Sequence, residues 1–229
     1  MKKFTNTFNK TSKAFTMLEL VFAIVVIGIL AVLSLSRMDR DFAQEAADNI
    51  LSDIRFTQHL ALTDNKHQFD DRRWERGYWR MIFSTCSGGG QYYMIGSDQD
   101  LSGANNAFFE QTEAAIDPAN GKPMFWNDLS NCDNGDPTNT SSDRIFITKK
   151  YGITGVTSSD GCANRKHIAF DHWGRPYHGT GFSSTVRPFH AGYMRKDCTF
   201  TFTWDDGRSF AIQINEETGY AWIVGQPDS

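Results

Sequence analysis

A predominantly apolar run over residues 15–35 constrains this chain more than any other part of its sequence. As an α-helix, a run of this length would be roughly 31 Å long, which matches the thickness of the hydrocarbon core of a bilayer. Glu19 is the single charged residue in the run, and a charge near mid-membrane costs about 2.5–3.5 kcal/mol on insertion scales. A residue retained at that cost indicates a function, so the run predicts a membrane helix that does more than anchor the chain.

The residues ahead of this run are basic. They contain no acid and four lysines, Lys2, Lys3, Lys10 and Lys13. Positive flanks remain in the cytoplasm, which predicts a single-pass protein with its C-terminal part outside. An ordinary signal peptide has its small-residue cleavage site after the apolar core, whereas Ala14 precedes the core here. Cleavage after Ala14 would keep the apolar segment and take the formal charge from −4 to −8.

This order of leader, cleavage site and apolar core resembles the class III signal of type IV prepilins and type II secretion pseudopilins. In those families a prepilin peptidase cuts immediately before a Phe, which becomes residue one of the mature protein, and residue five is Glu. The peptidase then methylates the new N-terminus. Ala14, Phe15 and Glu19 occupy these positions. The resemblance implies cleavage and methylation at Ala14 and Phe15, and pairing of Glu19 with the terminal amine of a neighbouring subunit. The alternative is a plain membrane anchor.

Apolar residues recur every four positions beyond the membrane run, as on one face of an amphipathic helix. They are Met38, Phe42, Ala46, Ile50 and Ile54, whereas Arg37, Arg40, Asp48 and Asp53 fall largely on other faces. We expect one helix over residues 15–65, membrane-spanning in its first half and packed on a sheet in its second. The predicted organisation is a cleaved leader over 1–14, this helix, and a β-rich periplasmic head over 66–229.

Short β-rich segments between turns dominate the predicted head. Residues 199–204 alternate polar and aromatic side chains, as a half-buried strand does, and a hairpin signal follows at 205–207. The expected strands cover 79–84, 91–95, 144–148, 166–170, 199–204, 209–214 and 220–224, with a short helix over 108–116. The fold class is α+β, a long N-terminal helix packed on an antiparallel head.

Two segments of the head are similar to the GspH/FimT group of minor pseudopilins. Residues 168–176 resemble the hairpin of that group, and residues 218–223 resemble the way such domains end. The resemblance implies a minor, tip-type subunit rather than a major one.

The four cysteines all follow the membrane run. An even number in an exported domain favours two disulfides over free thiols, and sequence permits three connectivities. Two of the cysteines each precede a predicted strand, so a bond between them would tie sheet edges and leave the other two as a pair. The preferred pairs are Cys162 with Cys198 and Cys86 with Cys132.

No enzyme signature stands out in the chain, which predicts a structural protein without cofactor or small-molecule substrate. Residues 131–136 could offer oxygens to calcium, but a polar turn is the favoured interpretation. Four histidines are close in sequence at unequal spacings, which favours ordinary core or surface histidines over a metal site. They are His167, His172, His178 and His190.

Residues 165–196 are strongly basic, with six Lys and Arg residues against Asp171. Aromatic residues lie between these cations, a mixture that binds nucleic acids. The candidates for DNA contact are Arg175, Arg187, Arg195 and Lys196. The favoured alternative is that the cations pair with acidic neighbours.

These patterns together predict a minor pilin or pseudopilin that assembles into or primes a type IV pilus or a type II secretion pseudopilus. Its expected partners are other pilins, the prepilin peptidase and the bacterial inner membrane. The alternative is a DNA-binding minor pilin of a competence pilus.

Overall fold

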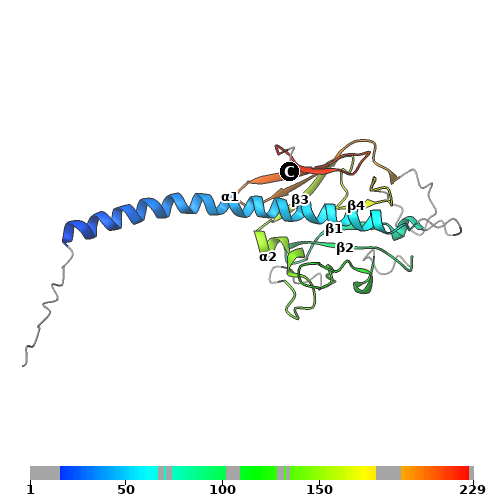
Figure 1. Cartoon of the computed structure of the whole chain (residues 1–229), viewed down its shortest axis with the longest axis horizontal. Coiled ribbons are helices and arrows are strands. Elements are labelled where there is room, and N and C mark those ends of the chain that lie inside the picture. The colour runs from blue at the N-terminus through cyan, green and yellow to red at the C-terminus, as the bar shows by residue number, and fades with distance from the viewer. Residues whose placement is uncertain are drawn as a thin grey trace, which may run out of the picture. The chain divides into compact units, whose positions relative to one another are not determined.

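A computed structural model describes residues 16–66, 70, 74–101, 109–127, 132, 135–178 and 192–226. The chain forms two compact units, Met1–Phe42 and Ala43–Ser229. Helix α1, Met17–Thr63, begins in the first unit and ends in the second (Figure 1). It lies within two residues of both ends of the expected helix, and Ala14 and Phe15 are outside the described residues.

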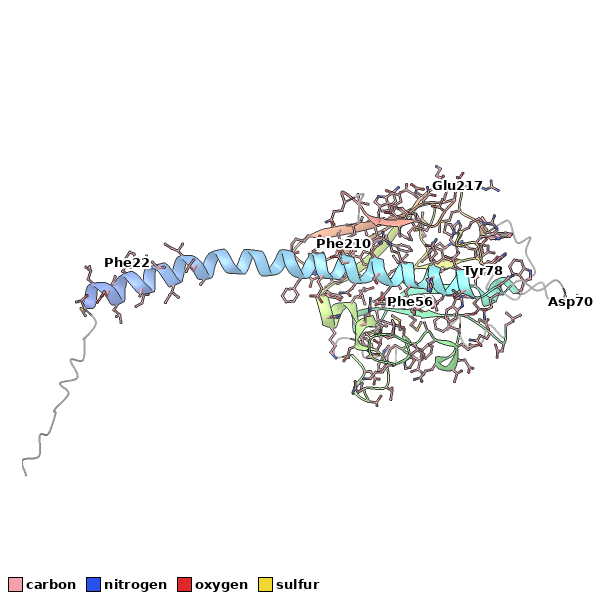
Figure 2. The ribbon with its side chains drawn as sticks, viewed as in Figure 1. Phe22, Phe56, Asp70, Tyr78, Phe210 and Glu217 are labelled. Carbon is pink, nitrogen blue, oxygen red and sulfur yellow. A yellow bond between two sulfur atoms is a disulfide. The ribbon has the colours of Figure 1, made fainter. Side chains whose placement is uncertain are left out.

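The first unit exposes apolar side chains along α1. Met17 is 87% exposed and Leu18 is 81% exposed, and Phe22 extends away from the ribbon in Figure 2. Among the described residues, no helix reaches the length and hydropathy required of a membrane span.

The second half of α1 packs into the head through its apolar face. Ala46, Ile50 and Ile54 are buried, as their four-residue spacing predicts, and Ala47 and Leu51 are buried beside them. Glu45, Asp48 and Ser52 remain exposed. The apolar spacing therefore identifies the face of α1 that contacts the head from Ala46 onward, whereas Phe42, an earlier member of the predicted face, is 50% exposed.

Two antiparallel four-stranded sheets form the head, which confirms the α+β class. The first sheet has the order β2-β1-β4-β5, and its strands are β1 Trp79–Thr85, β2 Gln91–Gly96, β4 His167–Phe170 and β5 Pro176–Tyr177. The second has the order β3-β6-β7-β8, and its strands are β3 Gly155–Asp160, β6 Cys198–Thr203, β7 Ser209–Ile214 and β8 Ala221–Ile223.

Aromatic contacts join the two sheets in one core. The Phe83 ring on β1 lies 5.1 Å from that of Phe200 and 5.4 Å from that of Phe202, both on β6. These two β6 residues are the inward positions of the strand that alternates aromatic and polar side chains. The alternation therefore places its aromatic side chains against the first sheet, in the core that also contains the buried face of α1.

The expected strand over 144–148 is wrong, because this segment is helical. It forms the 3₁₀ turn η4, Asp143–Ile145, and the short helix α2, Ile147–Tyr151. Ser142 caps η4, and Gly152 ends α2 with a φ of 71°, a conformation that favours glycine. Residues 145–147 are all buried, and a short run of buried apolar residues does not distinguish a strand from a helix.

Other short elements also differ from expectation. Within the described part of the expected helix 108–116, the structure has only the 3₁₀ turn η3, Gln111–Glu113. A further 3₁₀ turn, η1, covers Trp74–Gly77. Strand β3 was not predicted, because its Thr, Ser and Asp residues resemble a loop in composition.

Candidate functional site

Glu19 takes part in a reciprocal cap at the start of α1. Its Oε2 accepts hydrogen bonds from the N–H and the hydroxyl of Thr16, both at 3.1 Å. The Thr16 hydroxyl oxygen in turn accepts the N–H of Glu19 at 3.3 Å. This is a capping box, which satisfies helix N–H groups that have no partner within the helix. The Thr-x-x-Glu spacing was present in the sequence, but the sequence analysis assigned Glu19 to assembly alone.

All four cysteines are buried and paired. Cys86 bonds to Cys132 with a Cα–Cα distance of 5.9 Å, and Cys162 bonds to Cys198 with a Cα–Cα distance of 5.1 Å. These are the pairs that the sequence analysis preferred. The second bond joins the turn after β3 to the first residue of β6, so it closes one end of that strand pair.

A buried ion pair connects α1 to the head. Asp53 is 2% exposed, and Arg144 reaches it with Nε at 2.8 Å from Oδ2 and Nη2 at 2.7 Å from Oδ1. The Tyr93 hydroxyl donates to the same carboxylate. Burial raises the pKa of Asp53 to about 6, and the opposing effects of Tyr93 and Arg144 do not cancel it. The spacing of apolar residues predicts Asp53 largely on the polar side of α1, and this prediction is wrong because Asp53 is buried.

Residues 168–176 and 218–223, the two segments singled out in the sequence of the head, meet at α1. The side-chain amide of Gln58 donates to the carbonyl oxygens of Gly174 at 2.8 Å and Thr218 at 2.9 Å. A Cβ on Gly219 would overlap the Gly174 carbonyl oxygen, so the two turns are in direct contact. Residues about 40 positions apart therefore form one support for the helix.

Arg175, a candidate DNA contact, is already paired. Its Nη2 lies 2.7 Å from Oδ2 of Asp171, a fully buried carboxylate, and donates to the Tyr193 hydroxyl at 3.1 Å. Its guanidinium carbon lies 4.5 Å from the ring centroids of both Trp173 and Tyr193. This environment favours a structural role for Arg175.

The remaining candidate cations differ from Arg175. Arg195 and Lys196 are exposed, and neither forms an ion pair among the described residues. Arg187 lies outside the described residues. Arg195 and Lys196 are therefore the two predicted DNA contacts whose surroundings are consistent with a charged ligand.

Carboxylates, not histidines, form the single group of potential metal ligands within the described part of the chain. The oxygens of Asp98, Asp100 and Glu113 lie within 4.8 Å of one another. Glu113 accepts the N–H groups of Gln99 at 2.7 Å and Glu110 at 2.8 Å, so it also organises the loop. His190 lies outside the described residues. This acidic group alone does not establish a metal site.

Asp136, the last residue of the segment 131–136 that could offer oxygens to calcium, organises the turn that follows it. Its carboxylate accepts the N–H groups and hydroxyls of Thr138 and Thr140 and the N–H of Ser141. Burial opposes ionisation, but the hydrogen bonds outweigh it and hold the pKa of Asp136 well below its usual range. This carboxylate serves the turn, while Asn131, Asp133 and Asn134 lie outside the described residues.

Comparison with known families assigns residues 9–35 to the prokaryotic N-terminal methylation motif. The match includes Ala14, Phe15 and Glu19. No curated protein and no solved structure matches the chain. The matched motif is the class III signal of type IV prepilins and pseudopilins. Residues 9–35 therefore carry a signal of the type IV pilin and pseudopilin kind, and this motif implies processing by a prepilin peptidase and assembly with other pilins.

Proposed function

We propose that this protein is a minor pilin or pseudopilin that assembles into or primes a type IV pilus or a type II secretion pseudopilus. The observation that carries the proposal is the methylation motif over residues 9–35, whose apolar part forms the start of α1. The leader is removed between Ala14 and Phe15, and Phe15 is then methylated. Glu19 pairs with the terminal amine of a neighbouring subunit in the fibre.

The exposed apolar surface of the first unit supports assembly. Large apolar side chains from Met17 to Leu30 are 37% to 87% exposed among the residues that the structure describes. Apolar surface of this extent is covered by lipid or by protein in the cell. We assign lipid as the cover before assembly and the helices of other pilins afterwards, with residues 15–35 spanning the inner membrane and the head in the periplasm.

The composition of the head supports a minor subunit. Between β2 and β3 the described chain contains only short helical turns and irregular segments, and bulky loops hinder the repeated packing of a subunit along a fibre. The contact between residues 168–176 and 218–223 through Gln58 also brings together the two segments that resemble minor pseudopilins.

Mass spectrometry of the protein from its native membrane tests the processing step. The expected N-terminus is methylated Phe15. A variant with Arg in place of Ala14 should retain the leader, because the peptidase requires a small residue before the cut. An N-terminus at Met1 in the unaltered protein, or a cut after Leu33, would contradict the proposal.

A second candidate function is DNA capture by a minor pilin of a competence pilus. The specific observation in its favour is that Arg195 and Lys196 are exposed without an ion pair among the described residues. Binding would be weak, independent of sequence and strongly reduced by salt, because each phosphate contact releases counterions. A salt titration of DNA binding by the full chain tests this candidate.

A further inference from the structure

The Cys162–Cys198 disulfide joins two basic segments of the head. Asp160 and Cys198 are partners in the β3–β6 ladder, and the bond links the turn after β3 to the residues that precede β6. Four cations occupy these two segments, within four residues of a bonded cysteine. They are Arg165, Lys166, Arg195 and Lys196, and we call them the basic surface.

Backbone hydrogen bonds lie on both sides of residues 195–196, and the one on the Asp197 side joins the two segments. The N–H of Gly161 donates to the Asp197 carbonyl at 2.8 Å, and the N–H of His178 donates to the Gly192 carbonyl at 3.0 Å. Burial, and to a smaller extent the charge of Arg165, lowers the pKa of His178. Residues 195–196 are therefore tied on one side to the segment that carries Arg165 and on the other to the residue after β5.

The cations of the basic surface are accessible. Lys166, Arg195 and Lys196 are exposed, and Arg165 is half-buried. The Lys166 ammonium donates to the Thr85 hydroxyl at 3.2 Å, a neutral partner that leaves its charge uncompensated. None of the four forms an ion pair with a described residue.

The two acids adjoining these segments, Asp160 and Asp197, accept hydrogen bonds from residues other than the four cations. The Asp197 carboxylate accepts hydrogen bonds from Gln213 at 2.7 Å and from the Glu216 N–H at 3.1 Å, so it faces β7 and the turn that follows. Asp160 is exposed and accepts the Ser159 hydroxyl at 3.0 Å. The local excess of positive charge thus persists in a chain whose net charge is negative.

We propose that the basic surface binds the phosphate backbone of DNA and that the Cys162–Cys198 disulfide assembles it from its two segments. The inference rests on the second candidate function and replaces Arg175 with Arg165 and Lys166 among the contacts. Small and polar residues, Gly161, Ala163 and Asn164, occupy the turn between the cations. Such a turn offers little apolar area to a protein partner, whereas phosphate contacts need mainly charge and N–H groups.

Binding of a labelled single-stranded oligonucleotide of about 16 nucleotides to the full chain in detergent tests the contacts. Anisotropy is measured over a series of salt concentrations, starting at about 50 mM. Replacing both Arg195 and Lys196 with Gln should flatten the slope of log affinity against log salt by about 1.4, because each single-strand contact contributes about 0.7. The matched control replaces Lys149 and Lys150 with Gln. These exposed cations lie on α2, and their loss should leave the slope unchanged.

The role of the disulfide is tested with a second matched pair. A Cys162→Ser, Cys198→Ser variant should lose at least as much affinity as the Arg195 and Lys196 variant, since the covalent link between its two segments is lost. A Cys86→Ser, Cys132→Ser variant loses a disulfide of similar loop length, with sequence separation 46 against 36, and should keep its affinity. Circular dichroism identifies any variant that does not fold. The charge variants retain both disulfides, so they test the contacts even if a cysteine variant fails to fold.

The outcomes separate this inference from the functions on which it rests. Binding that depends on Arg195 and Lys196 but survives loss of the Cys162–Cys198 bond would overturn the assembly role and leave DNA capture standing. Equal binding by the Arg195 and Lys196 variant and its Lys149 and Lys150 control would overturn the site. If the unaltered chain bound no DNA, or bound polyglutamate but not DNA, the DNA candidate would be overturned as well. The pilin proposal would stand in either case.

Discussion

Asp53 should give the head a pH-dependent stability. Its folded-state pKa of about 6 lies above the ordinary 3.8, so the folded head binds this proton more tightly than the unfolded chain does. The resulting contribution to the free energy of unfolding is fully present below about pH 4 and is lost as the pH rises to about 6. Urea unfolding of the wild type and of Asp53→Asn, measured across this range, should show this loss in the wild type alone.

The same residue should matter for stability at neutral pH. Asp53→Ala leaves Arg144, which is 19% exposed, without its bidentate partner, and breaking such a buried pair costs about 3–5 kcal/mol. Asp48→Ala is the matched control, because Asp48 lies on the exposed side of the same helix. Equal stability of the two variants would show that the ion pair does not secure α1 to the head.

Thr16 allows the two roles of Glu19 to be separated. Thr16→Val removes the hydroxyl of the capping box and should weaken the helix start by about 1 kcal/mol, while assembly into fibres continues. Glu19→Ala removes the carboxylate needed for subunit pairing, so this variant should be cleaved and inserted but not assembled. Immunodetection of each variant in sheared fibre fractions makes the comparison. Equal failure of both variants would assign the defect to the cap.

At the scale of elements, Gln58 secures the β4–β5 turn to α1. Gln58→Leu preserves the size of the side chain but removes the donor to two carbonyl groups. The expected loss is about 1–3 kcal/mol in the free energy of unfolding. His59→Ala, at an exposed neighbour, should change stability by less than about 0.5 kcal/mol. Chemical denaturation measures both values.

The sequence predicted the long helix and most strands well, including the short strands β4 and β8, but it missed the short helix α2 and strand β3. Helix α1 and strands β6 and β7 have strong repeats of four and two residues, and their bounds lie close to the expected ones. The segment 144–148 has no such repeat, because Ile145, Phe146 and Ile147 are all buried. Sequence spacing also gave no sign that Asp53 is buried, since its partners Tyr93 and Arg144 are 40 and 91 positions away.

The candidate site was predictable where it depends on local sequence. The methylation motif is a contiguous signal, and residues 9–35 carry it without reference to the fold. The accessibility of each cation depends on distant contacts. Arg175 and Arg195 lie in the same basic stretch of sequence and were both predicted to contact DNA. In the structure, Arg175 pairs with a fully buried carboxylate, whereas Arg195 has no ion pair among the described residues.

At the scale of the molecule, the second unit should fold without the first. Residues 43–229 contain the core, both sheets and both disulfides. A protein beginning at Ala43 and exported to an oxidising compartment should be soluble, with β-rich circular dichroism and no free thiol. Aggregation of this protein, or four reactive thiols after purification, would show that the head requires the preceding residues.

The position of the helix cap has a consequence for maturation. The first backbone hydrogen bond of α1 joins the Leu20 N–H to the Thr16 carbonyl at 3.2 Å, and the capping box uses Thr16 and Glu19 alone. The proposed cut after Ala14 lies ahead of all these groups. The peptidase would therefore cut without removing Thr16, Glu19 or the hydrogen bonds between them, so the mature subunit keeps this cap.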